Sequence, residues 1–158
     1  MRRLGPLTVA WLLAACATAP DAALPPEIRW GVDECSRCHM ILSEERFAAA
    51  ARSETGEEAR FDDLECAADY LAAGGAGGWT TWVVTDAGWR RAGDAWLVYE
   101  QDLVTPMGSG LVAYASEQAA RDRALAPGSQ VLRWQELTGA AGEPPDVAAP
   151  TREHPTAE

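Results

Sequence analysis

Residues 58–85 read EARFDDLECAADYLAAGGAGGWTTWVVT, and this stretch predicts a strand, a helix and a second strand in that order. The helix is indicated over residues 64–73, where small and apolar side chains recur at helical spacing: Leu64, Ala68, Leu71 and Ala72. Asp62 or Asp63 can cap its first turn, and Asp62 has capping-box spacing to Glu65. The glycines that follow end the helix, and the run WTTWVVT at residues 79–85 favours a strand.

The same order of elements recurs in the second half of the chain. In the first half, residues 46–53 and a turn at residues 54–57 lead into the quoted stretch, which completes a β-β-α-β unit. The second half is predicted to contain strands at residues 96–100 and 111–115, a helix capped by Ser116 that ends near residue 126, and a strand at residues 131–137. The sequence therefore predicts an α+β fold of two similar β-β-α-β units, at about residues 43–87 and 88–138.

The N-terminus is typical of an exported lipoprotein. Two arginines precede an apolar run that is too short to span a bilayer as a permanent helix, which indicates a signal peptide over residues 1–15. LAAC at residues 13–16 resembles the lipobox of bacterial lipoproteins, in which the cysteine is acylated; the alternative is an ordinary signal peptide with a chance cysteine. Acylation of Cys16 would anchor the protein to a membrane. Ala17 favours, by resemblance to the sorting rules of diderm bacteria, a periplasm-facing position at the outer membrane.

Two segments lack the periodicity of folded structure. Residues 16–29 contain Ala, Pro and Asp in no regular pattern and are predicted to form a disordered tether between the lipid and the domain. Residues 139–158 are rich in Pro, Ala and Glu and are predicted to form a disordered tail. The folded domain is therefore expected at residues 30–138.

Charge and composition exclude several classes of protein. The net charge is −11 and every basic residue is Arg, so the surface repels nucleic acid, which binds to positive surfaces. The chain has two His and contains no Ser-His-Asp set, paired glycosidase carboxylates, P-loop or dinucleotide fingerprint. We therefore expect a binding protein rather than an enzyme.

The strongest chemical signal is CSRCHM at residues 35–40. Cys35 and Cys38 can hold one metal ion from a single turn, and Met40 adds a thioether. Soft sulfur ligands favour Cu(I), whereas zinc sites use Cys, His and carboxylates with Met essentially absent. Met107 lies on the long loop DLVTPMGSG at residues 102–110, a kind of extension that often carries function. These four residues are candidate Cu(I) ligands, although either methionine can instead be an ordinary packing residue.

Three weaker candidates accompany them. His39 is either a ligand or a solvent-facing residue. Cys66 can be a third ligand, a disulfide partner or a small buried residue, and its place in the first turn of a helix is expected to lower its thiol pKa. Asp62 is either a helix cap or a carboxylate near the metal.

Because the motif follows a tether and Met107 lies on a glycine-flanked loop, we expect a site of two mobile pieces that a partner opens one ligand at a time.

Two other classes of protein would use the same cysteines. A thiol-disulfide oxidoreductase would use Cys35 and Cys38, but catalytic dithiols usually open a helix after a strand, and here the motif precedes the first strand. A zinc-stapled structural module would use both of these thiols with Cys66 and His39, and chelation would unfold it.

These features together resemble the NosL family of copper-binding lipoproteins. The resemblance rests on the lipobox, the CxxCxM motif, FDDLEC at residues 61–66 and TPMGSG at residues 105–110, and it covers roughly residues 16–137. It implies two β-β-α-β units related in fold to part of the organomercurial lyase family. It also implies Cu(I) binding and supply of copper to apo nitrous oxide reductase and its assembly machinery. His39 departs from the family pattern, which commonly has Gly between the second Cys and the Met.

Overall fold

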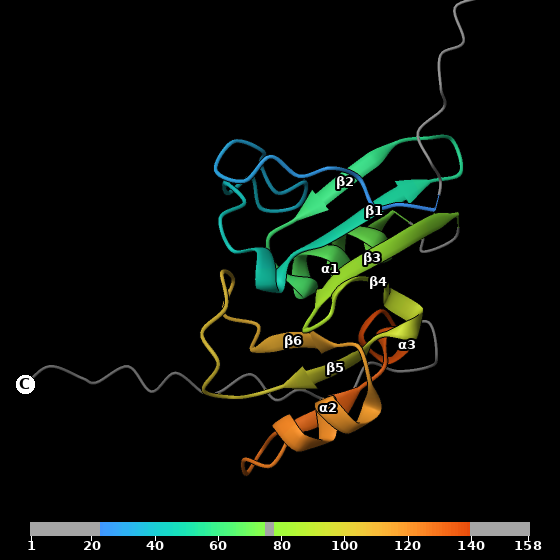
Figure 1. Ribbon diagram of the computed structural model, residues 1–158. Helices are drawn as coiled ribbons and strands as arrows, with labels where there is room; N and C mark the ends of the chain where they lie inside the picture. Colours follow the sequence, from blue (N-terminus) through green and yellow to red (C-terminus); the bar gives the residue numbers. More distant parts are fainter. Residues whose placement is uncertain (1–22, 75–77, 140–158) are drawn as a thin grey trace, which may run out of the picture.

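A seven-stranded sheet forms the centre of the protein in a computed structural model that describes residues 23–74 and 78–139 (Figure 1). The strand order is β2-β1-β3-β6-β5-β7, and β4 pairs with β3 beside this path. The strands are β1 (Ala49–Ser53), β2 (Glu58–Phe61), β3 (Trp79–Thr85), β4 (Gly88–Arg91), β5 (Trp96–Tyr99), β6 (Leu111–Tyr114) and β7 (Gln130–Leu132). The helices are α1 (Leu64–Ala73), α2 (Glu117–Arg123) and α3 (Trp134–Leu137), with short 3-10 turns at η1 (Glu45–Phe47) and η2 (Ala92–Asp94).

The two halves of the sheet have the same topology, which confirms the predicted fold. In the first unit β1 lies between β2 and β3, and α1 connects β2 to β3. In the second unit β5 lies between β6 and β7, and α2 connects β6 to β7. The units join where β3 and β6 run parallel, with Thr85 opposite Ala113. The order of elements in the sequence therefore repeats as an order of strands in space.

The second unit departs from its predicted elements at three places. Residues 88–91, where no strand was predicted, form β4 and pair with the end of β3. Helix α2 has the predicted Ser116 cap but ends at Arg123. The predicted strand at residues 131–137 is wrong beyond Leu132, because α3 follows it and buries Trp134 in a core cluster to which both units contribute.

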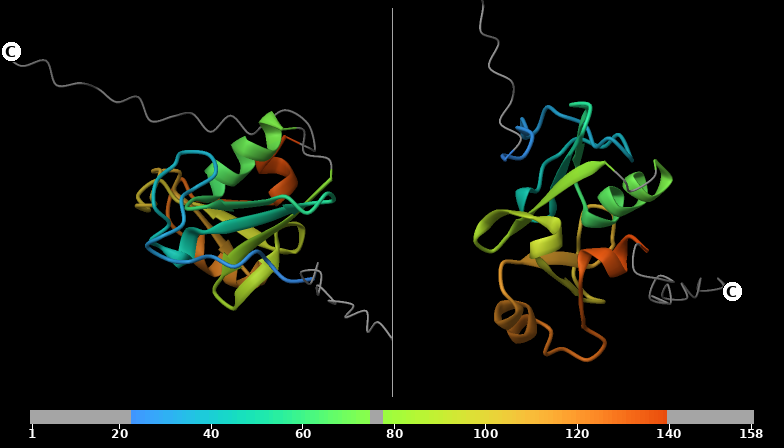
Figure 2. Two further views of the ribbon diagram at one scale, coloured as in Figure 1. Left: turned by 90° about the horizontal axis from the view of Figure 1, so that it is seen from above. Right: turned by 90° about the vertical axis from the view of Figure 1, so that its right-hand side faces the viewer.

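The helices cover both faces of the sheet (Figure 2). Leu97 of β5 packs into the larger core with α1 and Trp134, whereas its neighbour Val98 packs into a second cluster with Ala120 of α2. Successive side chains of a strand point to opposite faces, so α1 and α3 lie on one face and α2 on the other. The larger core also contains Phe61, Leu64 and two of the cysteines, which places the thiols in an apolar setting.

The last residues of the predicted tether are fastened to the domain. The Arg52 guanidinium donates a hydrogen bond to the Leu24 carbonyl at 3.0 Å, and that of Arg60 donates to the Glu27 carbonyl at 2.6 Å. Ile28 packs against the core. A disordered tether that reaches residue 29 is therefore wrong for residues 24–29.

Other predicted segments fall outside the described part of the chain. The signal peptide, Cys16 and residues 140–158 of the tail lie there. Among the residues that the structure describes, none forms a helix of the length and apolarity needed to cross a membrane.

Candidate metal centre

The CSRCHM motif forms the tip of a small hairpin. Glu34 and Ile41 form an antiparallel bridge at its base, and the Cys35 N–H donates to the Met40 carbonyl at 2.8 Å. The His39 N–H then closes the turn on the Cys35 carbonyl at 2.9 Å. His39 has a φ of 62°, in the left-handed region that favours glycine. A glycine at this position would adopt the same conformation without steric strain.

The hairpin is attached to the outer edge of β2, the first strand of the sheet (Figure 1). The Ser36 N–H donates to the Arg60 carbonyl at 2.8 Å, and the Arg60 N–H donates to the Ser36 hydroxyl at 3.0 Å. These bonds satisfy backbone groups at an edge strand that would otherwise lack partners. Both thiols therefore lie on a loop that is hydrogen-bonded to the sheet, while the expectation that a partner opens this loop stays a prediction.

The β2–α1 junction carries two neighbouring carboxylates with different roles. Asp63, not Asp62, caps α1: its Oδ1 accepts a hydrogen bond from the Glu65 N–H at 3.0 Å. Its backbone is extended, with φ −147° and ψ 147°, so the side chains of Asp62 and Asp63 point to opposite sides. The capping-box role proposed for Asp62 is therefore wrong, and its carboxylate lies beside the Cys38 thiol instead.

Four ligand groups converge where the hairpin meets α1. One potential ligand atom from each of Cys35, Cys38, Asp62 and Cys66 lies within 4.8 Å of the others. The Cys38 Sγ is 3.5 and 3.6 Å from the two carboxylate oxygens of Asp62. The three cysteines of this group are free thiols. Cys35 and Cys66 are buried and Cys38 is partly exposed, so Cys38 is the thiol most open to a metal ion that arrives from solvent.

Burial raises the pKa of the two buried thiols of the cluster, Cys35 and Cys66, which favours their protonated forms in the absence of metal. It raises the pKa of the Cys35 thiol to about 11. Burial also raises the pKa of Cys66, and repulsion from Cys35 and Asp62 adds to this effect. The sequence-based expectation that the helix N-terminus lowers the Cys66 pKa is wrong, because desolvation of the thiolate outweighs the dipole. A metal ion that binds these thiols must displace their protons.

The other predicted ligands lie at the surface. Met40 and Met107 are 50% and 42% exposed, so neither is an ordinary core residue. The Met107 N–H donates to Oδ2 of Asp63 at 3.2 Å, which holds the Met107 loop beside the α1 N-terminus. His39 is exposed and does not belong to the group of converging ligand atoms. The structure thus brings Cys35 and Cys38 together with Cys66 and Asp62, which were the weaker candidate ligands in the sequence.

A family model for NosL matches residues 30–141, which include the hairpin, both sheet units and the Met107 loop. The chain belongs to the NosL family. A search of curated protein sequences gave no match. Among solved structures, the chain is similar in fold to the crystal structure of the copper chaperone NosL from Shewanella denitrificans. The two are 19% identical, with a TM-score of 0.60, and the match covers 73% of this chain and 99% of that one.

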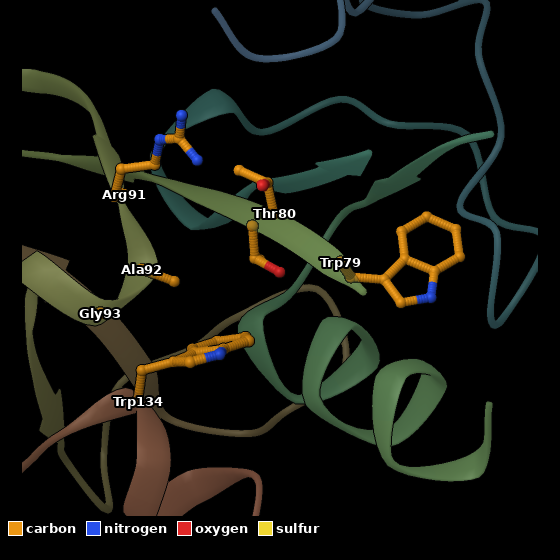
Figure 3. A pocket seen from close by; sticks show the side chains of 7 residues that line it. Trp79, Thr80, Arg91, Ala92, Gly93 and Trp134 are labelled. Carbon is orange, nitrogen blue, oxygen red and sulfur yellow. The ribbon is translucent and has the colours of Figure 1, made fainter. Parts of the chain in front are cut away.

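A separate hollow lies where β3, β4, η2 and α3 meet (Figure 3). Its volume is about 340 Å³, and it is lined by Trp79, Thr80, Thr81, Arg91, Ala92, Gly93 and Trp134. None of these lining residues offers a thiol, thioether, imidazole or carboxylate. The donor groups for a soft metal ion are therefore those of the thiol cluster and not those of this hollow.

Proposed function

We propose that this protein binds a single Cu(I) ion at Cys35, Cys38 and Cys66 and hands it to a partner protein. The observation that carries the proposal is the convergence of three free thiols and the Asp62 carboxylate within 4.8 Å. Thiolates are soft ligands that select Cu(I) over hard cations. The partly exposed Cys38 gives the ion a route between solvent and the two buried thiols.

The methionines favour copper over zinc. Three thiolates and a carboxylate are acceptable zinc ligands, whereas thioethers belong to copper sites. Met40 follows the two cysteines on the same hairpin, and Met107 is held at the α1 N-terminus through Asp63. We propose that one or both thioethers contact the ion at the solvent side. The fold relative from Shewanella denitrificans, a copper chaperone by its description, supports the same choice.

The position of Cys35 and its raised pKa are unfavourable for a thiol-disulfide oxidoreductase. A catalytic dithiol needs a thiolate of lowered pKa, usually at a helix N-terminus. Cys35 lies in a hairpin turn, and burial raises its pKa to about 11. A buried thiol of this kind is a slow nucleophile, but it becomes a good ligand once a metal ion displaces its proton.

Metal competition tests this proposal. The chain with C16A, which leaves only the three cluster thiols, is reduced and titrated with Cu(I) and Zn(II) against chelators of known affinity. We expect one Cu(I) per chain, with an affinity well above that for Zn(II). The double variant M40L/M107L should weaken Cu(I) binding and leave Zn(II) binding unchanged. Tighter binding of zinc, or Cu(I) binding that survives loss of all three thiols, would refute the proposal.

Delivery and location extend the same proposal. We propose that Cys16 carries a lipid which holds the protein on the periplasmic side of the outer membrane. We also propose that apo nitrous oxide reductase, with its assembly machinery, receives the copper. The lipobox at residues 13–16 and membership of the NosL family support this. Deletion of the gene should yield a reductase deficient in copper under copper limitation. Full copper content without the protein would refute delivery but not copper binding.

A further inference from the structure

Asp63 is a carboxylate near the metal centre that accepts hydrogen bonds from both the helix α1 and the Met107 loop. It is fully buried, and both of its carboxylate oxygens accept hydrogen bonds. Oδ1 caps α1 through the Glu65 N–H, while Oδ2 accepts from the Thr105 hydroxyl at 2.7 Å and from the Met107 N–H at 3.2 Å. One carboxylate therefore links the helix that carries Cys66 to the loop that carries Met107.

The loop is shaped so that this link fixes the position of Met107. The Gly108 N–H donates to the Thr105 carbonyl at 3.0 Å, which closes a β-turn with Pro106 and Met107 at its central positions. The Thr105 side chain is buried, and its hydroxyl is also 3.2 Å from the Ser109 hydroxyl. The turn is thus a compact unit, and Asp63 holds it at two points.

The base of the loop is fixed independently. The Glu100 N–H donates to the Gly110 carbonyl at 2.9 Å, and a Cβ on Gly110 would lie 2.4 Å from the Glu100 carbonyl oxygen. The bonds from Thr105 and Met107 to Asp63 join the tip of this loop to the N-terminus of α1. We therefore expect loss of the carboxylate to free the tip while the base keeps its backbone bond.

We propose that Asp63 is a positioning residue that holds Met107 at the metal centre by joining the Met107 loop to α1. This inference rests on the proposed function, because it assigns Asp63 a role in Cu(I) binding through the Met107 thioether. Asp62 contacts the cluster directly and Asp63 acts only through the loop. Asp62 therefore serves the thiol cluster, and Asp63 serves the Met107 thioether.

A double-mutant cycle tests the role of Asp63. Asn is as good an N-cap as Asp, so D63N keeps α1 capped but has one acceptor oxygen where the wild type has two. Loss of partners that orient a ligand typically costs roughly 10-fold or more in metal affinity. We expect D63N and M107L each to weaken Cu(I) binding by about that factor, and D63N/M107L to bind within about twofold of M107L alone.

The control and a second readout separate positioning from a general structural defect. D102N changes the same group at an exposed position of the same loop and should leave the affinity unchanged. Met40 and Met107 are the methionines after the initiator, so each ¹³C-labelled methyl group gives its own NMR signal. Cu(I) should shift the Met107 signal in the wild type and much less in D63N, while the Met40 response is retained. If D63N fails to fold, T105V removes one of the two bonds to Oδ2 without altering the cap.

Two results would overturn the inference. The first is a D63N effect of equal size with and without Met107, since Asp63 would then act by another route. The second is an unchanged Met107 signal on Cu(I) addition to the wild type. Absence of Cu(I) binding in the wild type is a different outcome, because it refutes the proposed function itself.

Discussion

Replacing Cys66 with alanine removes one buried thiol from the metal centre and leaves the hairpin thiols in place. Burial raises the pKa of Cys66 above its ordinary value and that of Cys35 to about 11, so both carry protons between pH 6 and pH 8. Each thiol that becomes a thiolate ligand releases its proton on metal binding. Raising the pH over this range therefore strengthens Cu(I) binding, and C66A should reduce that dependence.

The size of the effect follows from proton counting. Each proton displaced contributes a factor of about ten in apparent affinity per pH unit, as long as the pH stays well below the pKa of the thiol. Loss of Cys66 as a ligand removes one such proton. A plot of the logarithm of Cu(I) affinity against pH should therefore have a slope lower by about one in C66A than in the wild type.

Competition with a Cu(I) chelator of known pH dependence, at several values between pH 6 and pH 8, measures this slope. M107L is the matched control, because a thioether carries no proton: it should lower the affinity and leave the slope unchanged. C35A should reproduce the reduced slope of C66A. An identical slope for C66A and the wild type would show that Cys66 is not a thiolate ligand.

Three further predictions test other parts of the account. In D62N, loss of the carboxylate beside the cluster should lower the pKa of Cys35 from about 11, so thiolate absorbance near 240 nm should appear at lower pH. An unchanged titration would contradict the assigned contact. G110A should lower the free energy of unfolding in urea by about 3 kcal/mol or more, and G108A by about 1 kcal/mol. Both glycines have a positive φ, but only at Gly110 would the added Cβ collide with a backbone oxygen, that of Glu100. H39G should stabilise the fold by up to about 1 kcal/mol by relieving a left-handed φ, and Cu(I) affinity should change less than about twofold; a larger loss would make the imidazole a ligand.

The first unit of the fold could be predicted because its signals are local. Apolar spacing, an acidic cap and terminating glycines define the helix at residues 64–73, and the structure has α1 at Leu64–Ala73. The strand after it is a run of β-branched residues and Trp. Repetition of this order indicated the second unit even though the side chains of the two units differ.

The end of the second unit could not be predicted from local pattern. QVLRWQEL at residues 130–137 looks like a strand throughout, but the partner strand β5 spans only Trp96–Tyr99, so β7 pairs over three residues. The Trp134 side chain is buried in the core cluster that both units share, and α3 begins. Tertiary packing overrides strand propensity at this point.

In the metal centre, too, some residues could be predicted from local pattern and others could not. Cys35 and Cys38 could be identified because their spacing is a motif in itself. Cys66 was a weaker candidate because its approach to them depends on a non-local fact, the Ser36–Arg60 bonds that fasten the hairpin to β2. No spacing in the sequence encodes an attachment between segments that lie 24 residues apart.

X-ray absorption spectroscopy at the copper edge, on the reduced chain loaded with one equivalent of Cu(I), tests the central claim most directly. The account predicts a first coordination shell composed of sulfur, an edge typical of Cu(I), and loss of one sulfur from that shell in C66A. A shell dominated by nitrogen or oxygen, or a sulfur shell that is the same in C66A as in the wild type, would contradict a copper centre built where the CSRCHM hairpin meets α1.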